Sequence, residues 1–171
     1  MNNIASVIVN SPVGELFISA SREGLRELSF ADRAGEKAES TPATGEGPAS
    51  GHLNECRYQL EEYFIGRRKS FELEFDIDGT PFQVAVWREL AAIPFGETRS
   101  YGEIAERAGK RGAARAVGGA NHRNPIAIII PCHRVIESNG KLGGYGGGLD
   151  RKKWLLGHEK CVIDIIRQNQ E

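Results

Sequence analysis

Short hydrophobic runs separated by polar turns along the first thirty positions predict β-strands. Three runs rich in branched or aromatic side chains, residues 4–9, 15–20 and 25–30, are separated by turns that contain glycine or proline. We therefore predict a β-meander. A later alternation of large apolar and polar residues over 70–77 predicts one more strand.

The segment between the meander and that last strand divides into two parts. Residues 31–52 contain no large apolar side chain and are crowded with Gly, Pro, Ala, Ser, Thr and Glu, which predicts a long mobile surface loop. Residues 53–65 carry large apolar side chains at spacings of three and four, which predicts an amphipathic helix. We expect residues 1–78 to form one small α+β domain, because the strands before the loop still need a partner.

Helical patterns dominate from residue 79 to residue 171, which we take as a second domain. Thr80 is a typical cap for a helix opened by Pro81 and closed at residues 94–96. Ser100 caps a second short helix over 101–109, and a third covers 113–121. Two short helices joined by a tight turn have helix-turn-helix spacing, so this domain is a candidate nucleic-acid binder.

The apolar run over 126–130 predicts a buried strand, and directly after Pro131 come Cys132, His133 and Arg134. A cysteine in an apolar context is usually an inert core residue. Neighbouring His and Arg side chains can instead lower the thiol pKa and make it a nucleophile. A lone Cys-His pair supplies at most two metal ligands, so we predict no metal site and no cofactor.

Composition excludes several other classes of protein. With 171 residues, 40% hydrophobic and 26% charged, the chain is typical of a globular protein with a real core. Three scattered cysteines are too few for a disulfide framework. The sequence has neither a signal-peptide pattern nor the ~20 apolar residues of a membrane span, which predicts a cytoplasmic protein with no membrane partner.

The motif PCHRV at 131–135 resembles the active-site signature of the methylated-DNA–protein-cysteine methyltransferases, also called O6-alkylguanine-DNA alkyltransferases. The resemblance is dense over 79–159 and loose over 1–78. It extends in order through Thr80-Pro81-Phe82-Gln83, Val86-Trp87, Ile93-Pro94, Gly96, Thr98, Ser100-Tyr101, Ile104-Ala105, Arg115-Ala116-Val117-Gly118, Asn124-Pro125, Gly147-Gly148-Leu149, Lys152, Leu155-Leu156 and Glu159. The fold it implies is α+β, with a small ribonuclease H-like N-terminal sheet and helix followed by a mostly helical domain of winged-helix or helix-turn-helix type.

The activity implied by the resemblance is direct-reversal DNA repair. The partner is double-stranded DNA that contains O6-alkylguanine, and also O4-alkylthymine, and the protein acts as a monomer. The base is flipped out through the minor groove, and its methyl or alkyl group moves to Cys132 in a single turnover. Extrusion is needed because the target atom cannot be reached inside a stacked duplex.

The resemblance also implies a role for each catalytic candidate. Cys132 is the acceptor, His133 acts through a water as its base, and Glu159 orients that His. Tyr101 donates a proton to the departing guanine and rotates the phosphate, and Asn124 braces the turn before the active-site strand. A thiolate suits this displacement because it is a soft, strong nucleophile.

The implied DNA-contacting and base-binding residues form two further groups. Arg115 matches the inserted arginine finger of the family, and small side chains beside it suit a helix that enters the minor groove. The predicted DNA-contacting set is Ser100, Tyr101, Ala113, Ala114, Arg115, Ala116, Gly118 and Arg123. The predicted base-pocket set is Arg134, Val135, Tyr145 and Gly146, where many relatives carry Ser or Ala in place of Gly146.

The two halves of the chain differ in charge. Residues 1–80 carry 8 basic and 14 acidic side chains, a net charge of −6, and residues 81–171 carry 14 basic and 9 acidic ones, a net charge of +5. The net charge of −1 for the whole chain is therefore the sum of an acidic and a basic half. The basic half supplies phosphate contacts where the mechanism needs them. Two rival functions remain at this level: an alkyltransferase-like lesion-binding module, a class that lacks the acceptor cysteine, and a cysteine hydrolase that uses Cys132 and His133.

Overall fold

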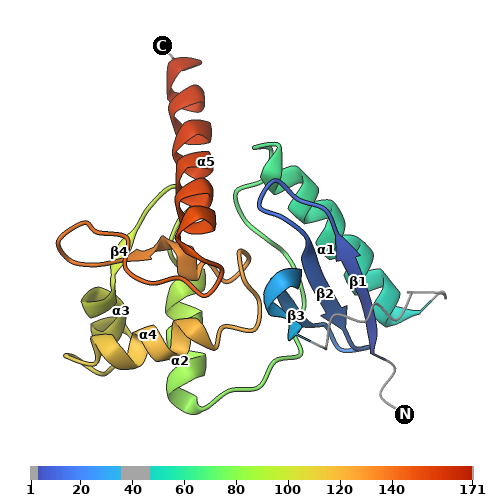
Figure 1. The fold of residues 1–171 in the computed structure, drawn as a ribbon, viewed down its shortest axis with the longest axis horizontal. Coiled ribbons are helices and arrows are strands. Elements are labelled where there is room, and N and C mark those ends of the chain that lie inside the picture. The colour runs from blue at the N-terminus through green and yellow to red at the C-terminus, as the bar shows by residue number, and fades with distance from the viewer. Residues whose placement is uncertain (1–3, 36–46, 171) are drawn as a thin grey trace. The chain divides into compact units, whose positions relative to one another are not determined.

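The computed structural model describes residues 4–35 and 47–170 and divides the chain into two compact units (Figure 1). Unit 1 consists of residues 1–77 together with 125–127, and unit 2 of residues 78–124 and 128–171. Each unit has its own hydrophobic core, so each is described by itself.

Unit 1 is built on a three-stranded antiparallel sheet in the order β1-β2-β3, which confirms the predicted β-meander. The strands are β1 (Ala5–Val9), β2 (Leu16–Ala20) and β3 (Leu25–Phe30). Every residue of the central strand β2 is buried, because it has a neighbour on both edges.

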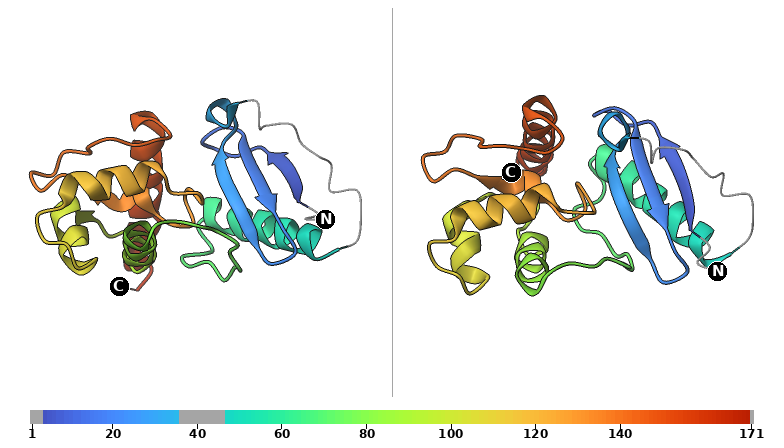
Figure 2. Two further views of the ribbon diagram at one scale, coloured as in Figure 1. Left: turned by 90° about the horizontal axis from the view of Figure 1, so that it is seen from below. Right: turned by 60° about the horizontal axis from the view of Figure 1, so that its bottom comes forward.

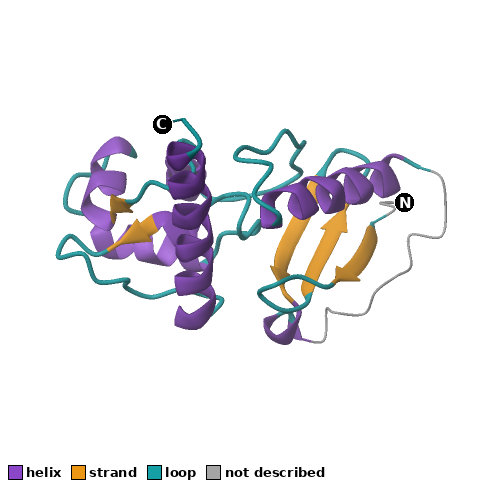
Figure 3. Ribbon diagram, turned by 90° about the horizontal axis from the view of Figure 1, so that it is seen from above, coloured by secondary structure: helices purple, strands orange, loops and turns teal. Residues whose placement is uncertain are grey.

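A single helix, α1 (Pro48–Phe64), packs against this sheet (Figures 2 and 3). It begins five residues before the predicted helix, so the prediction of a loop through residue 52 is wrong at its C-terminal end. Pro48 opens the helix because its missing N–H would be unpaired there in any case. Residues 31–33 form a short 3₁₀ helix, η1 (Ala31–Arg33), and the predicted loop residues 36–46 lie outside the described residues.

The strand predicted over 70–77 does not form. Only Phe75 makes an isolated bridge, to Leu25, through the hydrogen bonds Leu25 N–H to Glu74 O and Asp76 N–H to Leu25 O. The same edge of β3 pairs further along with residues 125–127, where Leu28 bridges Ile126. Two segments therefore share one short edge, and neither has enough partners for a full strand.

Unit 2 is mostly helical, and its helices begin where local capping signals place them. The helices are α2 (Pro81–Ala91), α3 (Tyr101–Arg107), α4 (Ala114–His122) and α5 (Leu149–Gln168). Thr80 caps α2 and Ser100 caps α3, each in a reciprocal capping box with the third helical residue, which confirms both predicted caps. Helices α2, α3 and α4 pack against one another.

A two-stranded parallel sheet, β4 (Arg99–Ser100) with β5 (Val135–Ile136), joins the start of α3 to the segment after Cys132. The buried strand predicted over 126–130 is not formed. The chain turns there instead, with Ile128 in the left-handed region at φ 69°. The segment's four isoleucine side chains are buried, but the backbone forms only the isolated bridge from Ile126 to Leu28 and no continuous ladder.

Candidate active site

Cys132 begins a one-turn 3₁₀ helix, η3 (Cys132–Arg134), directly after the turn at 126–130. The Cys132 N–H donates to Ile130 O at 2.8 Å, and the Asn124 side-chain amide donates to that same carbonyl at 2.7 Å. Asn124 thus ties the end of α4 to the turn that presents the cysteine. The predicted position of Cys132 at the end of a strand is corrected to the first residue of this short helix.

Burial raises the pKa of the Cys132 thiol, so the resting side chain is the neutral thiol. Several groups oppose that effect: a hydrogen bond from the Asn124 amide, the charge of Lys152, and the backbone N–H groups of Cys132 and His133. These donors stabilise a sulfur anion once it forms, but they do not create one in the resting protein. A base must therefore take the thiol proton.

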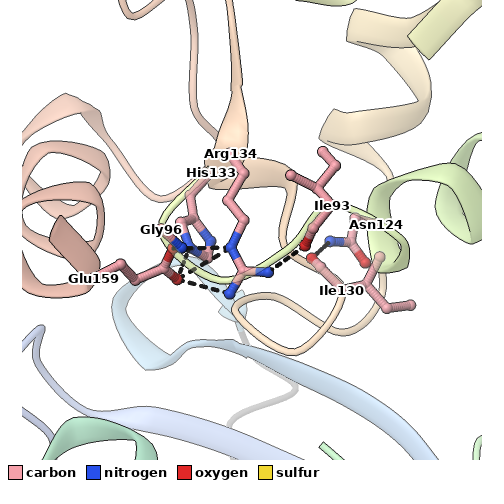
Figure 4. Close-up of polar contacts among 7 residues, drawn as sticks. All are labelled: Ile93, Gly96, Asn124, Ile130, His133, Arg134 and Glu159. Atoms are coloured by element: carbon pink, nitrogen blue, oxygen red, sulfur yellow. Dashed lines mark hydrogen bonds and ion pairs between the residues drawn. The ribbon is translucent and has the colours of Figure 1, made fainter. Parts of the chain in front are cut away.

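His133 and Glu159 lie side by side in the interior, although 26 residues separate them in the chain (Figure 4). The Nε2 of His133 is 2.7 Å from Oε1 of Glu159, and both side chains are fully buried. Burial lowers the pKa of His133 despite the opposing effect of Glu159, so the imidazole is neutral. With its proton on Nε2 and bonded to Glu159, His133 leaves Nδ1 as a lone-pair acceptor.

The Nδ1 atom of His133 is buried and has no hydrogen-bond partner among the described residues. A buried acceptor without a partner costs free energy and marks a position where a donor belongs. His133 directly follows Cys132 in the same short helix, which makes the Cys132 thiol a candidate for that donor.

Glu159 receives further donors besides His133. Arg134 contacts both of its carboxylate oxygens, at 2.9 Å from Nη2 to Oε1 and 2.9 Å from Nε to Oε2, and the Gly96 N–H donates to Oε2 at 3.1 Å. Burial alone would raise the pKa of Glu159, but the hydrogen bonds from His133 and Arg134 and the positive charge of Arg134 outweigh it and hold that pKa far below its usual range. Glu159 is therefore a permanent anion.

Lys152 is a fully buried lysine whose contacts join α5 to the segment that follows β5. Its ammonium group donates to three backbone carbonyls: Val135 at 2.6 Å, Gly144 at 3.1 Å, and Leu142. Burial lowers the pKa of Lys152 to about 8. Three carbonyl acceptors require the three protons of the ammonium form, so the charged state is the one that holds this loop.

Tyr101, the first residue of α3, lies against the same loop. Its hydroxyl donates to Gly144 O at 3.3 Å, and a Cβ added at Gly143 would come within 3.0 Å of its ring. Burial, followed by the charges of Cys132 and Glu137, raises the pKa of Tyr101, so its hydroxyl keeps its proton. Tyr101 is consequently a proton donor in the neighbourhood of Cys132.

Helix α4 has a buried inner face and a face that is open to solvent. Val117 and Ala120 are buried, and the Trp87 indole N–H donates to Ala120 O at 2.9 Å, which fixes α4 against α2. Arg115 and Ala116 are exposed, Ala113 and Ala114 are half-buried, and Arg123 is exposed just after the helix. Gly118 faces Tyr101, with 4.0 Å from an added Cβ to the ring.

The predicted base-pocket residues do not share one environment. Tyr145 is half-buried, and burial raises the pKa of its hydroxyl well above the usual value. Gly146 is exposed, and the Val135 side chain is fully buried with its carbonyl bound to Lys152. Arg134, the fourth residue of the predicted set, lies in a different environment from the other three. Its guanidinium is buried against Glu159 and donates to Ile93 O at 2.7 Å, so it has no free edge for a base.

Sequence reasoning named Lys152 only as part of the family pattern and missed its bonds to the loop. A signal was available in the spacing of Lys152, Leu155 and Glu159, which are the buried residues of α5 and lie on one helical face. A lysine in line with a core leucine is unusual and indicates a buried, partnered ammonium. The partners of that ammonium, which are backbone carbonyls, leave no trace in the sequence.

Among residues 4–35 and 47–170, no three His, Cys, Asp or Glu side chains gather in a way that could hold a metal ion. In the same described ranges, no helix combines the length and the apolar character that crossing a membrane requires. The three cysteines are free, and Cys132 is one of the two that are buried.

The fold is α+β: a small antiparallel sheet with one helix forms the first unit, and the second unit is helical. The second unit holds the buried residues Cys132, His133 and Glu159, so its candidate nucleophile is a buried thiol. Two family models match the chain: 6-O-methylguanine DNA methyltransferase, ribonuclease-like domain, over residues 5–77, and 6-O-methylguanine DNA methyltransferase, DNA binding domain, over residues 81–161. The chain belongs to the family of methylated-DNA–protein-cysteine methyltransferases.

Individual relatives support this assignment over nearly the whole chain. The methylated-DNA–protein-cysteine methyltransferase of Mycobacterium leprae is 51% identical over 155 residues, which cover 91% of this chain and 92% of the relative. The crystal structure of the Mycobacterium tuberculosis O6-methylguanine methyltransferase gives a TM-score of 0.81 at 46% identity, covering 92% of this chain and 93% of that one. The Mycobacterium tuberculosis OGT in complex with DNA gives a TM-score of 0.77 at 46% identity, covering 93% of each chain.

Proposed function

We propose that this protein repairs double-stranded DNA directly, by moving the methyl or larger alkyl group of O6-alkylguanine to the Sγ atom of Cys132. The observation that carries the proposal is the buried contact of His133 with Glu159, directly after Cys132 in the same short helix, with the Nδ1 of His133 open to accept a proton. It provides a nucleophile, a base and a group that orients the base. O4-alkylthymine is a secondary substrate of the same chemistry.

In the proposed reaction, the Cys132 thiol gives its proton to Nδ1 of His133, directly or through one water, and the sulfur attacks the alkyl carbon. The carbon–sulfur bond forms as the bond between that carbon and guanine O6 breaks. Glu159 stabilises the imidazolium that results, in the manner of other nucleophile–base–carboxylate arrangements. Taken over the whole reaction, the thiol proton replaces the alkyl group on guanine.

Tyr101 supplies a proton to the departing guanine, which then leaves as a neutral base. Its raised pKa keeps the hydroxyl protonated, and Gly144 O holds it in place before substrate arrives. The imidazolium of His133 restores the Tyr101 proton through solvent. Proton donation of this kind typically accelerates a reaction by about 10²- to 10⁴-fold.

The exposed face of α4 is the proposed contact with the minor groove. Ala113, Ala114, Ala116 and Gly118 let the helix backbone approach the duplex closely, and Arg115 fills the space that the flipped nucleotide vacates. Ser100 and Arg123 contact phosphates near the two ends of this surface. Tyr145 and the backbone of the loop at 143–148 enclose the flipped base.

The transfer occurs once for each protein molecule. A thioether has no good leaving group, so the alkyl group stays on the sulfur. The protein is therefore consumed in the reaction. We propose that it acts in the cytoplasm as a monomer without a cofactor, which suits its free thiols.

A stoichiometric transfer assay tests the proposal. Duplex DNA with a radiolabelled methyl group on O6 of one guanine is supplied in excess over the protein, and we expect transfer to stop at one label per protein molecule, with unmodified guanine left in the repaired DNA. Tight binding without label transfer would favour a lesion-binding module. Hydrolysis of thioester or amide substrates at Cys132, without label transfer, would favour a cysteine hydrolase.

A further inference from the structure

Arg134 is a buried cation that the proposed reaction does not use. Its side chain is about 6% exposed and makes four polar contacts within hydrogen-bond distance, all of them intramolecular. Three of these contacts are to the carboxylate of Glu159, and the fourth is to Ile93 O. The guanidinium also lies over the Phe95 ring, 5.7 Å from its centre. Every edge of the group is engaged, so its orientation is fixed.

The contacts of Arg134 determine the net charge of the groups that surround the His133 imidazole. A lone buried carboxylate beside an imidazole favours the imidazolium, and an imidazolium cannot accept the thiol proton. In this site the carboxylate of Glu159 is shared, because Oε1 accepts from both His133 and Arg134. The positive guanidinium offsets the negative charge that would otherwise draw a second proton onto His133.

Three charged residues among those that the structure describes act on the pKa of His133. Glu159 on α5 favours its protonated form, whereas Arg134 on η3 and Lys152 on α5 oppose it, as does burial. Arg134 differs from Lys152 in one respect. It touches the same carboxylate oxygen as His133, whereas the Lys152 ammonium is bonded to backbone carbonyls.

We propose that Arg134 is a positioning residue that locks Glu159 as an anion and keeps His133 as the neutral Nε2–H tautomer, ready to accept the Cys132 proton. The inference rests on the proposed function for its purpose, but it concerns a protonation state that can be measured without DNA. The planar fork of arginine is needed because it reaches both carboxylate oxygens at once, which the single ammonium of lysine does not.

The experiment compares the unmodified protein with Arg134→Gln, Arg134→Lys and the matched control Arg167→Gln, which removes an exposed arginine from the last turn of α5. The two readouts are the pH dependence of single-turnover methyl transfer and the imidazole nitrogen NMR signals of His133 across pH. Thermal unfolding and duplex binding are recorded for each variant.

We expect Arg134→Gln to shift the acid limb of the rate profile, and the titration of His133, upward by about 1 pH unit or more. Arg134→Lys keeps the charge but loses the fork, so its shift is smaller, and Arg167→Gln leaves both curves in place. A folded Arg134→Gln protein with an unchanged His133 titration would overturn the proposal.

The unmodified protein provides a test that does not depend on whether the variants fold. At pH 7 its His133 must show a protonated Nε2 and an unprotonated Nδ1, and an imidazolium there would also overturn the proposal. The two claims separate cleanly. If the protein transfers no methyl group, the proposed function fails, while the His133 titration in the Arg134 variants still decides the role of Arg134.

Discussion

Tyr101 and Lys152 donate hydrogen bonds to the same carbonyl oxygen, that of Gly144, at 3.3 and 3.1 Å. One donor begins α3 and the other lies on α5, so a single peptide group of the loop connects the two helices. The ammonium of Lys152 is also 5.9 Å from the centre of the Tyr101 ring. The proposed proton donor and the loop around the proposed base pocket are consequently positioned by one shared contact.

Tyr101→Phe is expected to slow methyl transfer to O6-methylguanine in duplex DNA by about 10²-fold. The ring would still pack near Gly118 and Gly143, so folding changes little, but the departing guanine would lose its proton donor. Single-turnover rates measured at saturating protein test this effect. A rate within twofold of the unmodified protein, with unchanged duplex affinity, would remove Tyr101 from the proton-donating role.

Gly143→Ala is expected to damage transfer more than Gly140→Ala does. Both glycines have a positive φ, at 69° and 83°, so alanine introduces roughly 1–2 kcal/mol of backbone strain at either position. Only at Gly143 would the new Cβ press against Tyr101, whereas nothing lies within 4 Å at Gly140. Similar losses of unfolding free energy with a slower transfer rate only in Gly143→Ala would support the pairing of this loop with Tyr101; equal rates would contradict it.

Arg115→Ala is expected to slow repair of duplex DNA far more than reaction with a free O6-alkylguanine base. The arginine acts on the duplex, by filling the vacated space, and takes no part in the chemistry at sulfur. Arg111→Ala is the control, since it removes an exposed cation that lies 3.8 Å from Glu106 and affects phosphate attraction only. Equal losses on both substrates would end the assignment of Arg115 as the inserted residue.

The buried His133 predicts a specific dependence of folding stability on pH. Its folded pKa lies below the ordinary value of 6.5, so the unfolded chain binds more protons below about pH 6.5. The free energy of unfolding therefore falls as the pH is lowered through that range, by at most about 1.4 kcal/mol per pH unit for one proton. The low pKa of Glu159 adds a second decline below about pH 4.5.

His133→Gln isolates the first of these two declines. The glutamine amide can still donate to Glu159 but does not titrate, so the slope between about pH 5 and 6.5 is expected to flatten while the decline below 4.5 remains. Urea unfolding at a series of pH values measures both. An unchanged slope in the upper window would show that His133 is not the group responsible.

Features that depend on a few neighbouring residues could be predicted from the sequence. The capping boxes at Thr80 and Ser100 are complete within four residues, so the starts of α2 and α3 were predictable. The strands expected over 70–77 and 126–130 failed because a strand also needs a partner edge. β3 offers that edge to both segments, one residue of each bridging it, at Phe75 and at Ile126.

The site divides in the same way between local and distant contacts. The PCHRV motif identifies Cys132 and His133 as candidates, but the contact of His133 with Glu159 spans 26 residues and was expected only through the family resemblance. Arg134 illustrates the limit of the motif, because the motif names the residue but does not show what its guanidinium contacts. The position of the Glu159 carboxylate, set by α5, decides that its guanidinium points inward.

Mass spectrometry of the protein after reaction with duplex DNA containing O6-methylguanine tests the central claim most directly. We predict that the intact protein gains the mass of one methyl group in place of one hydrogen, that peptide mapping locates it on Cys132, and that Cys132→Ala binds the same DNA without any gain. A methyl group on Cys56 or Cys161, or an unchanged mass after stable binding, would contradict the assignment of Cys132 as the acceptor.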